Sequence, residues 1–98
     1  MATITKKDLV DRIASSTGEK RFLAKHILQQ FLDDIAAELA RGNRIEFRDF
    51  GIFEVKERSA RTAQNPKTLK KVRVPARETV KFRAGRLMKE KLNSGVSN

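Results

Sequence analysis

The residues best placed for chemistry are the cations of one segment, residues 56–77. The segment contains eight Lys or Arg residues and a single acid, Glu57, and its only large apolar residues are Leu69, Val72 and Val74. Cations at this density neutralise phosphate groups, and so few apolar side chains cannot bury the segment against its own domain. We therefore expect an arm that is flexible alone and that a polyanion orders.

The charge of the rest of the chain supports this interpretation. The formal net charge is +10, yet residues 1–55 contain nine Lys or Arg and nine Asp or Glu, whereas residues 56–98 contain thirteen and three. A generic basic surface would spread its charge over the whole chain. The division predicts a scaffold in the first part and a surface for an acidic partner in the second, with DNA or RNA as the leading candidates.

Composition excludes several classes of protein. With no cysteine, one histidine and no clustered acids in the basic part, the sequence offers no catalytic or metal-binding constellation. We expect no enzyme activity, no cofactor and no small-molecule substrate. No apolar run approaches the length of a membrane span, roughly 20 residues, and the N-terminal residues lack the apolar region of a signal peptide. We expect a cytoplasmic protein without a membrane partner.

Two helices are expected in the scaffold. The first begins after Thr5. The Thr5 hydroxyl is expected to accept a hydrogen bond from the Asp8 amide, and the Asp8 carboxylate is expected to accept one from the Thr5 amide. It ends near Thr17, because Gly18 suits a left-handed C-terminus. The second covers residues 20–41, where apolar residues recur every four positions, at Leu23, Ile27, Phe31, Ile35 and Leu39. This stripe is wide for a surface helix and indicates several partners: the first helix, a sheet and a second copy of the chain.

Alternating apolar residues then predict two strands with one buried face each. Ile45 and Phe47 belong to the first strand, and residues 49–51 make a tight corner. Phe53 and Val55 continue the buried face in the second strand. The alternation fades after Val55, which marks the end of the core and the start of the arm.

The arm is predicted to be a two-stranded ribbon. It closes in a type I turn at Asn65-Pro66-Lys67-Thr68, where the proline ring fixes φ and the asparagine side chain bonds the following backbone. The ribbon returns through residues 71–75, and a short strand at residues 80–82 re-enters the core. A short amphipathic helix with Leu87, Met88 and Leu92 on one side follows, and residues 93–98 are expected to form a frayed polar tail.

Three motifs and their spacing carry a resemblance to a known family. They are the Phe50-Gly51-x-Phe53 corner, the arginine-rich arm tipped by Asn65-Pro66-x-Thr68, and the Phe82-x-x-Gly85-Arg86 segment. Over nearly its whole length the chain resembles the bacterial histone-like HU and integration host factor family. The resemblance implies an α+β fold with two N-terminal helices, a small antiparallel sheet extended into a β-ribbon arm, and a short C-terminal helix, in an intertwined dimer.

The resemblance also implies a function. It points to a nucleoid-associated, DNA-bending architectural protein that binds duplex DNA through the minor groove with weak sequence specificity. Residues 1–55 would be the dimerisation scaffold, residues 56–77 the arm, and residues 78–98 the returning strand and C-terminal helix. The dimer would be a homodimer or would pair the chain with a related subunit. Proteins of this family insert an apolar wedge from each arm into a base step, which makes Pro66 the candidate wedge.

The resemblance and the charge pattern together nominate two sets of residues. Those expected to contact DNA lie on the arm and at a few positions of the body: Lys6, Lys56, Arg58, Arg61, Asn65, Pro66, Lys67, Lys71, Arg73, Arg86 and Lys89. Those expected in the aromatic core of the dimer are Phe31, Phe47, Phe50, Phe53 and Phe82. The arm itself has no aromatic residue, so stacking platforms for bases are not expected there.

Four positions depart from the family pattern. Asp49 stands where a glycine usually precedes the Phe-Gly pair, and Ala63 and Gln64 replace a glycine and a frequent arginine before the tip. Leu69 replaces a glycine that usually follows Thr68. Because a side chain disfavours positive φ, we expect at Leu69 either an altered turn or an apolar contact of its side chain with a sugar.

Other functions fit part of the pattern. The charge alone agrees equally well with an RNA-binding or ribosome-associated protein. A basic membrane-surface protein would need a longer amphipathic helix than the last one. On turn chemistry alone Pro66 is an ordinary turn proline, and its place at the tip of a long basic ribbon, with the resemblance, favours the wedge.

Overall fold

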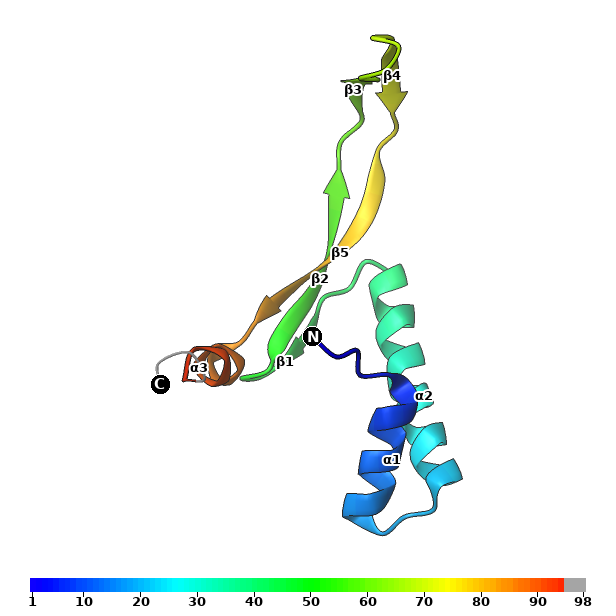
Figure 1. Ribbon diagram of the computed structural model, residues 1–98, viewed down its shortest axis with the longest axis vertical. Helices are drawn as coiled ribbons and strands as arrows, with labels where there is room; N and C mark the ends of the chain where they lie inside the picture. The colour runs from blue at the N-terminus through cyan, green and yellow to red at the C-terminus, as the bar shows by residue number, and fades with distance from the viewer. Residues whose placement is uncertain (95–98) are drawn as a thin grey trace. The chain divides into compact units, whose positions relative to one another are not determined.

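The structure is a computed structural model that describes residues 1–94 and forms two compact units, Met1–Ala37 and Glu38–Asn98. The elements in chain order are α1 (Lys6–Thr17), α2 (Arg21–Ala40), β1 (Ile45–Phe47), β2 (Gly51–Arg58), β3 (Arg61–Gln64), β4 (Lys71–Val74), β5 (Arg77–Ala84) and α3 (Arg86–Ser94) (Figure 1). Helices at both ends and antiparallel strands between them confirm the predicted α+β class.

Helix α1 begins and ends where the local sequence predicts. The Asp8 amide donates to the Thr5 hydroxyl at 3.3 Å, and the Thr5 amide donates to the Asp8 carboxylate at 2.9 Å, so the capping box is complete. These hydrogen bonds from Thr5 hold the pKa of Asp8 below its ordinary value. At the other end Gly18 has a φ of 76° and donates its amide to the Ala14 carbonyl oxygen.

Helix α2 carries an apolar stripe that the chain alone leaves largely uncovered. Within residues 1–94 the buried apolar side chains are Val10, Ala24 and Leu39. Ile27 is 60% exposed and Phe31 is 47% exposed, although both lie in the middle of the stripe. So small a core is unusual for a folded domain of this length and indicates that another surface covers the stripe.

The second unit is built on a three-stranded antiparallel sheet with the order β1-β2-β5. Between β1 and β2 the Phe50 amide donates to the Phe47 carbonyl oxygen at 3.0 Å, and Asp49 has a φ of 69°, which confirms the predicted tight corner. The rings of Phe53 and Phe82 lie 4.8 Å apart across β2 and β5, and those of Phe50 and Phe82 lie 5.7 Å apart. This aromatic cluster is the apolar centre of the unit.

The strands at the base of the ribbon are longer than predicted. Instead of a short strand at residues 80–82, β5 runs over Arg77–Ala84 and pairs with β2 along its whole length, down to the Arg58–Arg77 pair. Pairing continues past Val55 because backbone hydrogen bonds need no apolar side chains. The exposure of the side chains from Lys56 onward confirms that the core ends at Val55.

Helix α3 is anchored to the corner between β1 and β2. The Gly85 amide donates to the Phe50 carbonyl oxygen at 2.8 Å, and the Met88 amide donates to the Asp49 carbonyl oxygen at 3.4 Å. The helix continues to Ser94, so the beginning of the predicted frayed tail is helical instead. The rest of that tail, residues 95–98, lies outside the described residues.

Gly51, at the start of β2, provides a test of this packing. A Cβ atom on Gly51 would lie 2.4 Å from Phe82 Cζ and 2.7 Å from the Arg83 carbonyl oxygen. Such overpacking costs about 1–3 kcal/mol, and here the ring can yield but the backbone of β5 cannot. We expect Gly51→Ala to lower the free energy of unfolding by about 2 kcal/mol in urea denaturation.

The control for this test is Ser15→Ala, at an exposed position of α1. It is expected to change the free energy of unfolding by less than about 0.5 kcal/mol. If Gly51→Ala unfolds at the same urea concentration as the parent chain, β2 and β5 are less closely packed at this point than the structure indicates.

Candidate nucleic-acid interface

The register of β2 and β5 sorts their side chains onto two faces. Residues paired across an antiparallel ladder project to the same side, and successive residues alternate. Phe53 pairs with Phe82 and Val55 with Val80, which makes one face apolar. The other face holds the cations, and we call it the cationic face: Lys56, Arg58, Arg77, Lys81 and Arg83.

The cationic face contains little negative charge to offset it. Glu54, opposite Lys81 in the register, is its one acid within β2 and β5, and the Arg83 Nε lies 2.8 Å from the Glu54 carboxylate. Among the ion pairs of the described residues, none involves Arg58, Arg61 or Arg77. These three guanidinium groups therefore have their charge available for an external anion.

Two ammonium groups crowd each other on this face. A side-chain hydrogen bond with Lys56, together with charge repulsion from it, lowers the pKa of Lys81 below its ordinary value. An anion bound between them would weaken the repulsion and raise that pKa again. The pair is thus better suited to a polyanion than to solvent alone.

A break in the strand pairing creates a groove at the middle of the ribbon. The ladder of β2 and β5 ends at the Arg58–Arg77 pair, and the ladder of β3 and β4 begins at the Arg61–Val74 pair. Pro75 lies in the gap and has no amide hydrogen to continue the ladder. The groove has a volume of ≈ 430 Å³ and is lined by Arg58, Ser59, Arg61, Val74, Pro75, Arg77 and Thr79.

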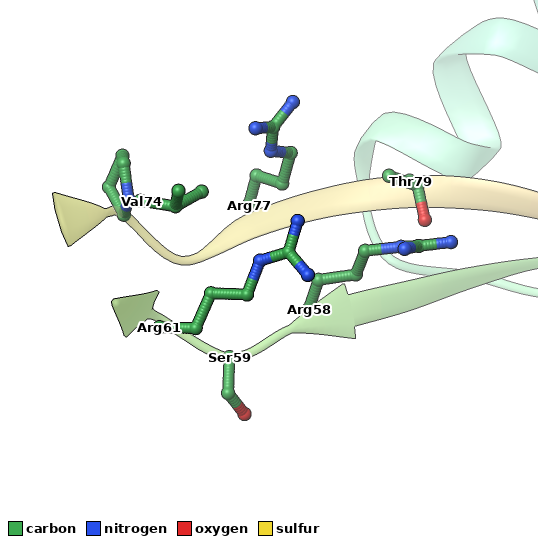
Figure 2. A pocket seen from close by; sticks show the side chains of 7 residues that line it. Arg58, Ser59, Arg61, Val74, Arg77 and Thr79 are labelled. Carbon is green, nitrogen blue, oxygen red and sulfur yellow. The ribbon is translucent and has the colours of Figure 1, made fainter. Parts of the chain in front are cut away.

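Three arginines from both sides of the ribbon surround this groove, and we call it the three-arginine groove. Figure 2 shows Arg58 at the end of β2, Arg61 at the start of β3, and Arg77 on β5 across the ribbon. A guanidinium group stays charged at all physiological pH values and offers a planar set of donors that matches two phosphate oxygens. The groove is therefore suited to the phosphates of a nucleic-acid backbone.

Beyond the groove, the β3–β4 ladder has one largely apolar face and one polar face. In the β3–β4 register Ala63 pairs with Val72 and Arg61 with Val74, so one face of the distal ladder is largely apolar. The opposite face carries Thr62, Gln64, Lys71 and Arg73. Figure 1 shows β3 and β4 as the continuation of the strands that form the base.

The tip lies where the sequence predicts, but the turn is one residue longer than a type I turn. The amide that closes it belongs to Leu69 and not to Thr68. The Leu69 amide donates to the Asn65 carbonyl oxygen at 2.8 Å, and the Lys67 amide donates to Asn65 Oδ1 at 2.9 Å. The expected asparagine bond to the following backbone is confirmed. The predicted type I turn is wrong, and the turn is altered at Leu69 as expected, although Leu69 keeps a positive φ of 58°. The hydrogen bonds that close the turn outweigh the local steric preference.

The structure distributes the nominated residues over several elements. Lys56 and Arg58 lie on β2, Arg61 on β3, Lys71 and Arg73 on β4, and Asn65, Pro66 and Lys67 at the exposed tip. Arg86 and Lys89 lie on α3, where the Arg86 Nε is 3.4 Å from Glu90. Lys6 belongs to the other unit, where its ammonium donates to Gln29 and helps to line a groove of ≈ 290 Å³.

The nominated aromatic residues also occupy two units. Phe47 contacts Phe50 and Phe53, with ring centroids 6.1 Å and 6.3 Å apart, and Phe82 joins the same cluster. Phe31 lies on α2 in the first unit. Their place in a dimer core remains a prediction.

Three residues of the cationic face were missed by the sequence-based nomination: Arg77, Lys81 and Arg83. Their alternate spacing along residues 77–83 is the signal that a full-length strand would have revealed. It was hidden because a strand of only residues 80–82 was expected. The register then places Arg77 beside Arg58, although the two are far apart in the sequence.

Features of other kinds of site were also sought in the part of the chain that the structure describes. No helix there combines the length and the apolarity that crossing a membrane requires. In the same residues no three His, Cys, Asp or Glu side chains are grouped as they would be around a metal ion.

Comparison with known proteins connects this geometry with one family. Residues 4–93 match the family described as bacterial DNA-binding protein. DNA-binding protein HU of Thermotoga maritima is 40% identical over 89 residues, which cover 91% of this chain and 99% of the relative. Integration host factor subunit alpha of Acinetobacter baumannii is 32% identical over 94 residues, which cover 96% of each chain.

Solved structures show the same similarity in three dimensions. An Anabaena HU–DNA cocrystal structure is 35% identical, with a TM-score of 0.82 over 90% of this chain and 96% of that chain. The HU protein of Thermotoga maritima gives a TM-score of 0.62 at 30% identity, over 90% of this chain and 97% of that chain. The matched region spans both units and the ribbon.

Arg77 provides the test of the three-arginine groove. Arg77→Gln removes one charge-assisted phosphate contact from each arm, and each loss is expected to weaken duplex DNA binding about tenfold and to reduce the slope of log K against log salt by about 0.9. Fluorescence anisotropy over a series of salt concentrations measures both quantities.

The matched control is Arg41→Gln, which removes the same charge from an exposed arginine that is paired with Glu38. It is expected to leave the salt slope unchanged. Equal effects of the two substitutions would mean that only net charge matters and that the groove holds no phosphate.

Proposed function

The chain belongs to the bacterial DNA-binding protein family, and we propose that it bends duplex DNA by laying its ribbon in the minor groove. The members of this family are DNA-binding architectural proteins and not enzymes. The observation that supports the proposal best is the order of chemistry along the ribbon. Cations occupy one face of its base, three arginines its middle, and apolar residues one face of its distal ladder, which leads to the exposed proline at the tip.

This order matches the way that the surface of a duplex changes from its backbone to its minor groove. Phosphates attract the cationic face and the three-arginine groove, and their neutralisation releases counterions. Beyond the phosphates the walls of the minor groove are sugar carbons, and packing of Ala63, Val72 and Val74 against them is favourable because it removes apolar surface from water. Pro66, at the end of the ribbon, is then placed to enter a base step as the wedge.

The same geometry implies weak sequence preference. The minor groove distinguishes A·T from G·C pairs but barely distinguishes their orientations. The cost of unstacking a step, about a few kcal/mol, depends on the flexibility of that step. Binding should therefore follow the deformability of the duplex more than its base sequence.

We also propose that the working form is an intertwined dimer located on the nucleoid in the cytoplasm. Its support is the poor coverage of apolar side chains on α2, together with the exposure of Phe50 and Val80 in the second unit. A second copy, or a related subunit, would cover these surfaces and present two arms to one duplex. In this arrangement residues 1–55 are the dimerisation scaffold, residues 56–77 the arm, and residues 78–98 the returning strand and C-terminal helix.

The wedge is tested by removing the proline ring. Pro66→Ala is expected to reduce the bend more than the affinity, because the phosphate contacts remain while the unstacked step is no longer filled. Energy transfer between dyes at the ends of a short duplex measures the bend. On a duplex with a gap at the bending position the substitution should matter less, because that step is already unstacked.

Two results would contradict the proposed function. If the parent chain brings the dye-labelled ends no closer, it does not bend DNA. If structured RNA displaces duplex DNA clearly in competition, an RNA-binding function replaces the one proposed.

The dimer is tested at Ile27, which is 60% exposed in the single chain. Ile27→Glu places a charge in the proposed interface and is expected to convert dimers into monomers in sedimentation equilibrium. Gln30→Glu, at an exposed position of the same helix, introduces the same charge and should leave the dimer intact. A parent chain that sediments as a monomer at all concentrations would exclude the dimer.

A further inference from the structure

The backbone at the tip is strained at one residue, Leu69, and we propose that its side chain is a second apolar contact of the arm with DNA. In this proposal Leu69 rests on the deoxyribose wall of the minor groove, three positions after the Pro66 wedge. The inference rests on the proposed function and deepens it by naming a further DNA-contacting residue of the same arm.

The first argument is the cost of the conformation. Leu69 and Asp49 are the non-glycine residues with positive φ among the described residues, at 58° and 69°. Aspartate is several-fold enriched in this region because its short polar side chain bonds the local backbone, whereas leucine has no such compensation. A glycine would adopt the same turn without strain. The leucine side chain therefore adds strain while most of its surface stays without a contact in the described chain.

The second argument is that the backbone of Leu69 is fully committed to the turn. Its amide donates to the Asn65 carbonyl oxygen at 2.8 Å, and its carbonyl oxygen accepts from Gln64 Nε2 at 3.2 Å. The Asn65 amide donates to the Lys70 carbonyl oxygen at 2.9 Å on the other side of Leu69. These bonds hold the tip in one shape, so the direction of the leucine side chain is set before any ligand binds.

The third argument is the exposure of the side chain. Leu69 is 68% exposed, more than any other large apolar residue of the described chain except Met1. Val72, the next large apolar residue along the arm, is 48% exposed. The chain leaves most of the Leu69 side chain in water, and a ligand that covers it would lower the free energy of the complex.

The fourth argument identifies the ligand. Lys67, Lys70 and Lys71 flank the leucine in the sequence, so an apolar group stands among cations. A duplex offers a matching surface, because phosphates line the edges of the minor groove while sugar carbons form its walls. A leucine that reaches past the phosphates would meet those carbons and would be shielded from water there.

The test compares substitutions that separate the side chain from the turn. Leu69→Gly relieves the strain, and Leu69→Asn tolerates the left-handed conformation while removing the apolar group. Both are expected to weaken binding to a gapped duplex about tenfold in a dimer that carries both arms. Leu69→Met keeps an apolar side chain and should stay within about twofold of the parent.

Two further readouts show that the lost contact is apolar and local. The slope of log K against log salt should not change, because no phosphate contact is lost. Leu92→Asn, at an exposed leucine of α3 with 63% exposure, is the matched control and should bind as the parent does.

The outcomes separate this inference from the proposed function. If the parent chain does not bind or bend the duplex, the proposed function fails and the inference fails with it. If the parent bends DNA but Leu69→Gly binds equally well or better, the leucine is only a strained residue and the inference alone is overturned. Binding to anionic vesicles that depends on Leu69, with duplex binding unchanged by the substitutions, would assign the side chain to a membrane surface instead.

Discussion

The antiparallel register between β2 and β5 is the constraint on which the ribbon depends. Because paired residues share a face, the register places Phe53 against Phe82 on one side and Arg58 beside Arg77 on the other. A slip of one residue would exchange the faces of one strand and bring cations against the aromatic cluster. The pairing that assembles that cluster therefore also determines where the positive charge lies.

The interruption of strand pairing between the β2–β5 and β3–β4 ladders also shapes the ribbon. The gap at Pro75 separates two ladders and opens the groove that Arg58, Arg61 and Arg77 surround. An unbroken ladder would keep paired side chains in regular rows and would leave no such concavity. The irregularity of the ribbon thus produces its most concentrated group of donors.

Strain and incomplete burial both indicate that the single chain is not the whole functional unit. Apolar side chains of α2 remain exposed because the chain has too few elements to cover them. Leu69 holds a conformation that its side chain disfavours, at a place where only a ligand provides apolar cover. In the proposed function, a partner subunit and a duplex supply the two missing surfaces.

The sequence by itself determined the features that depend on neighbouring residues. The ends of α1 follow from Thr5, Asp8 and Gly18, because caps are local hydrogen bonds and a local backbone conformation. The division of charge and the position of the tip turn can likewise be predicted from the sequence. The family resemblance, confirmed by relatives that match nearly the whole chain, extended these features to a fold and a function.

Only the tertiary structure decided the features that depend on pairing between distant segments. The length of β5 and the positions of Arg77, Lys81 and Arg83 follow from its register with β2, which local periodicity does not encode. The type I closure of the tip was mispredicted for a related reason, because Leu69 adopts a positive φ inside a wider turn. Steric preference is a property of one residue, whereas the bonds that override it come from Asn65 and Gln64, which the turn brings back against it.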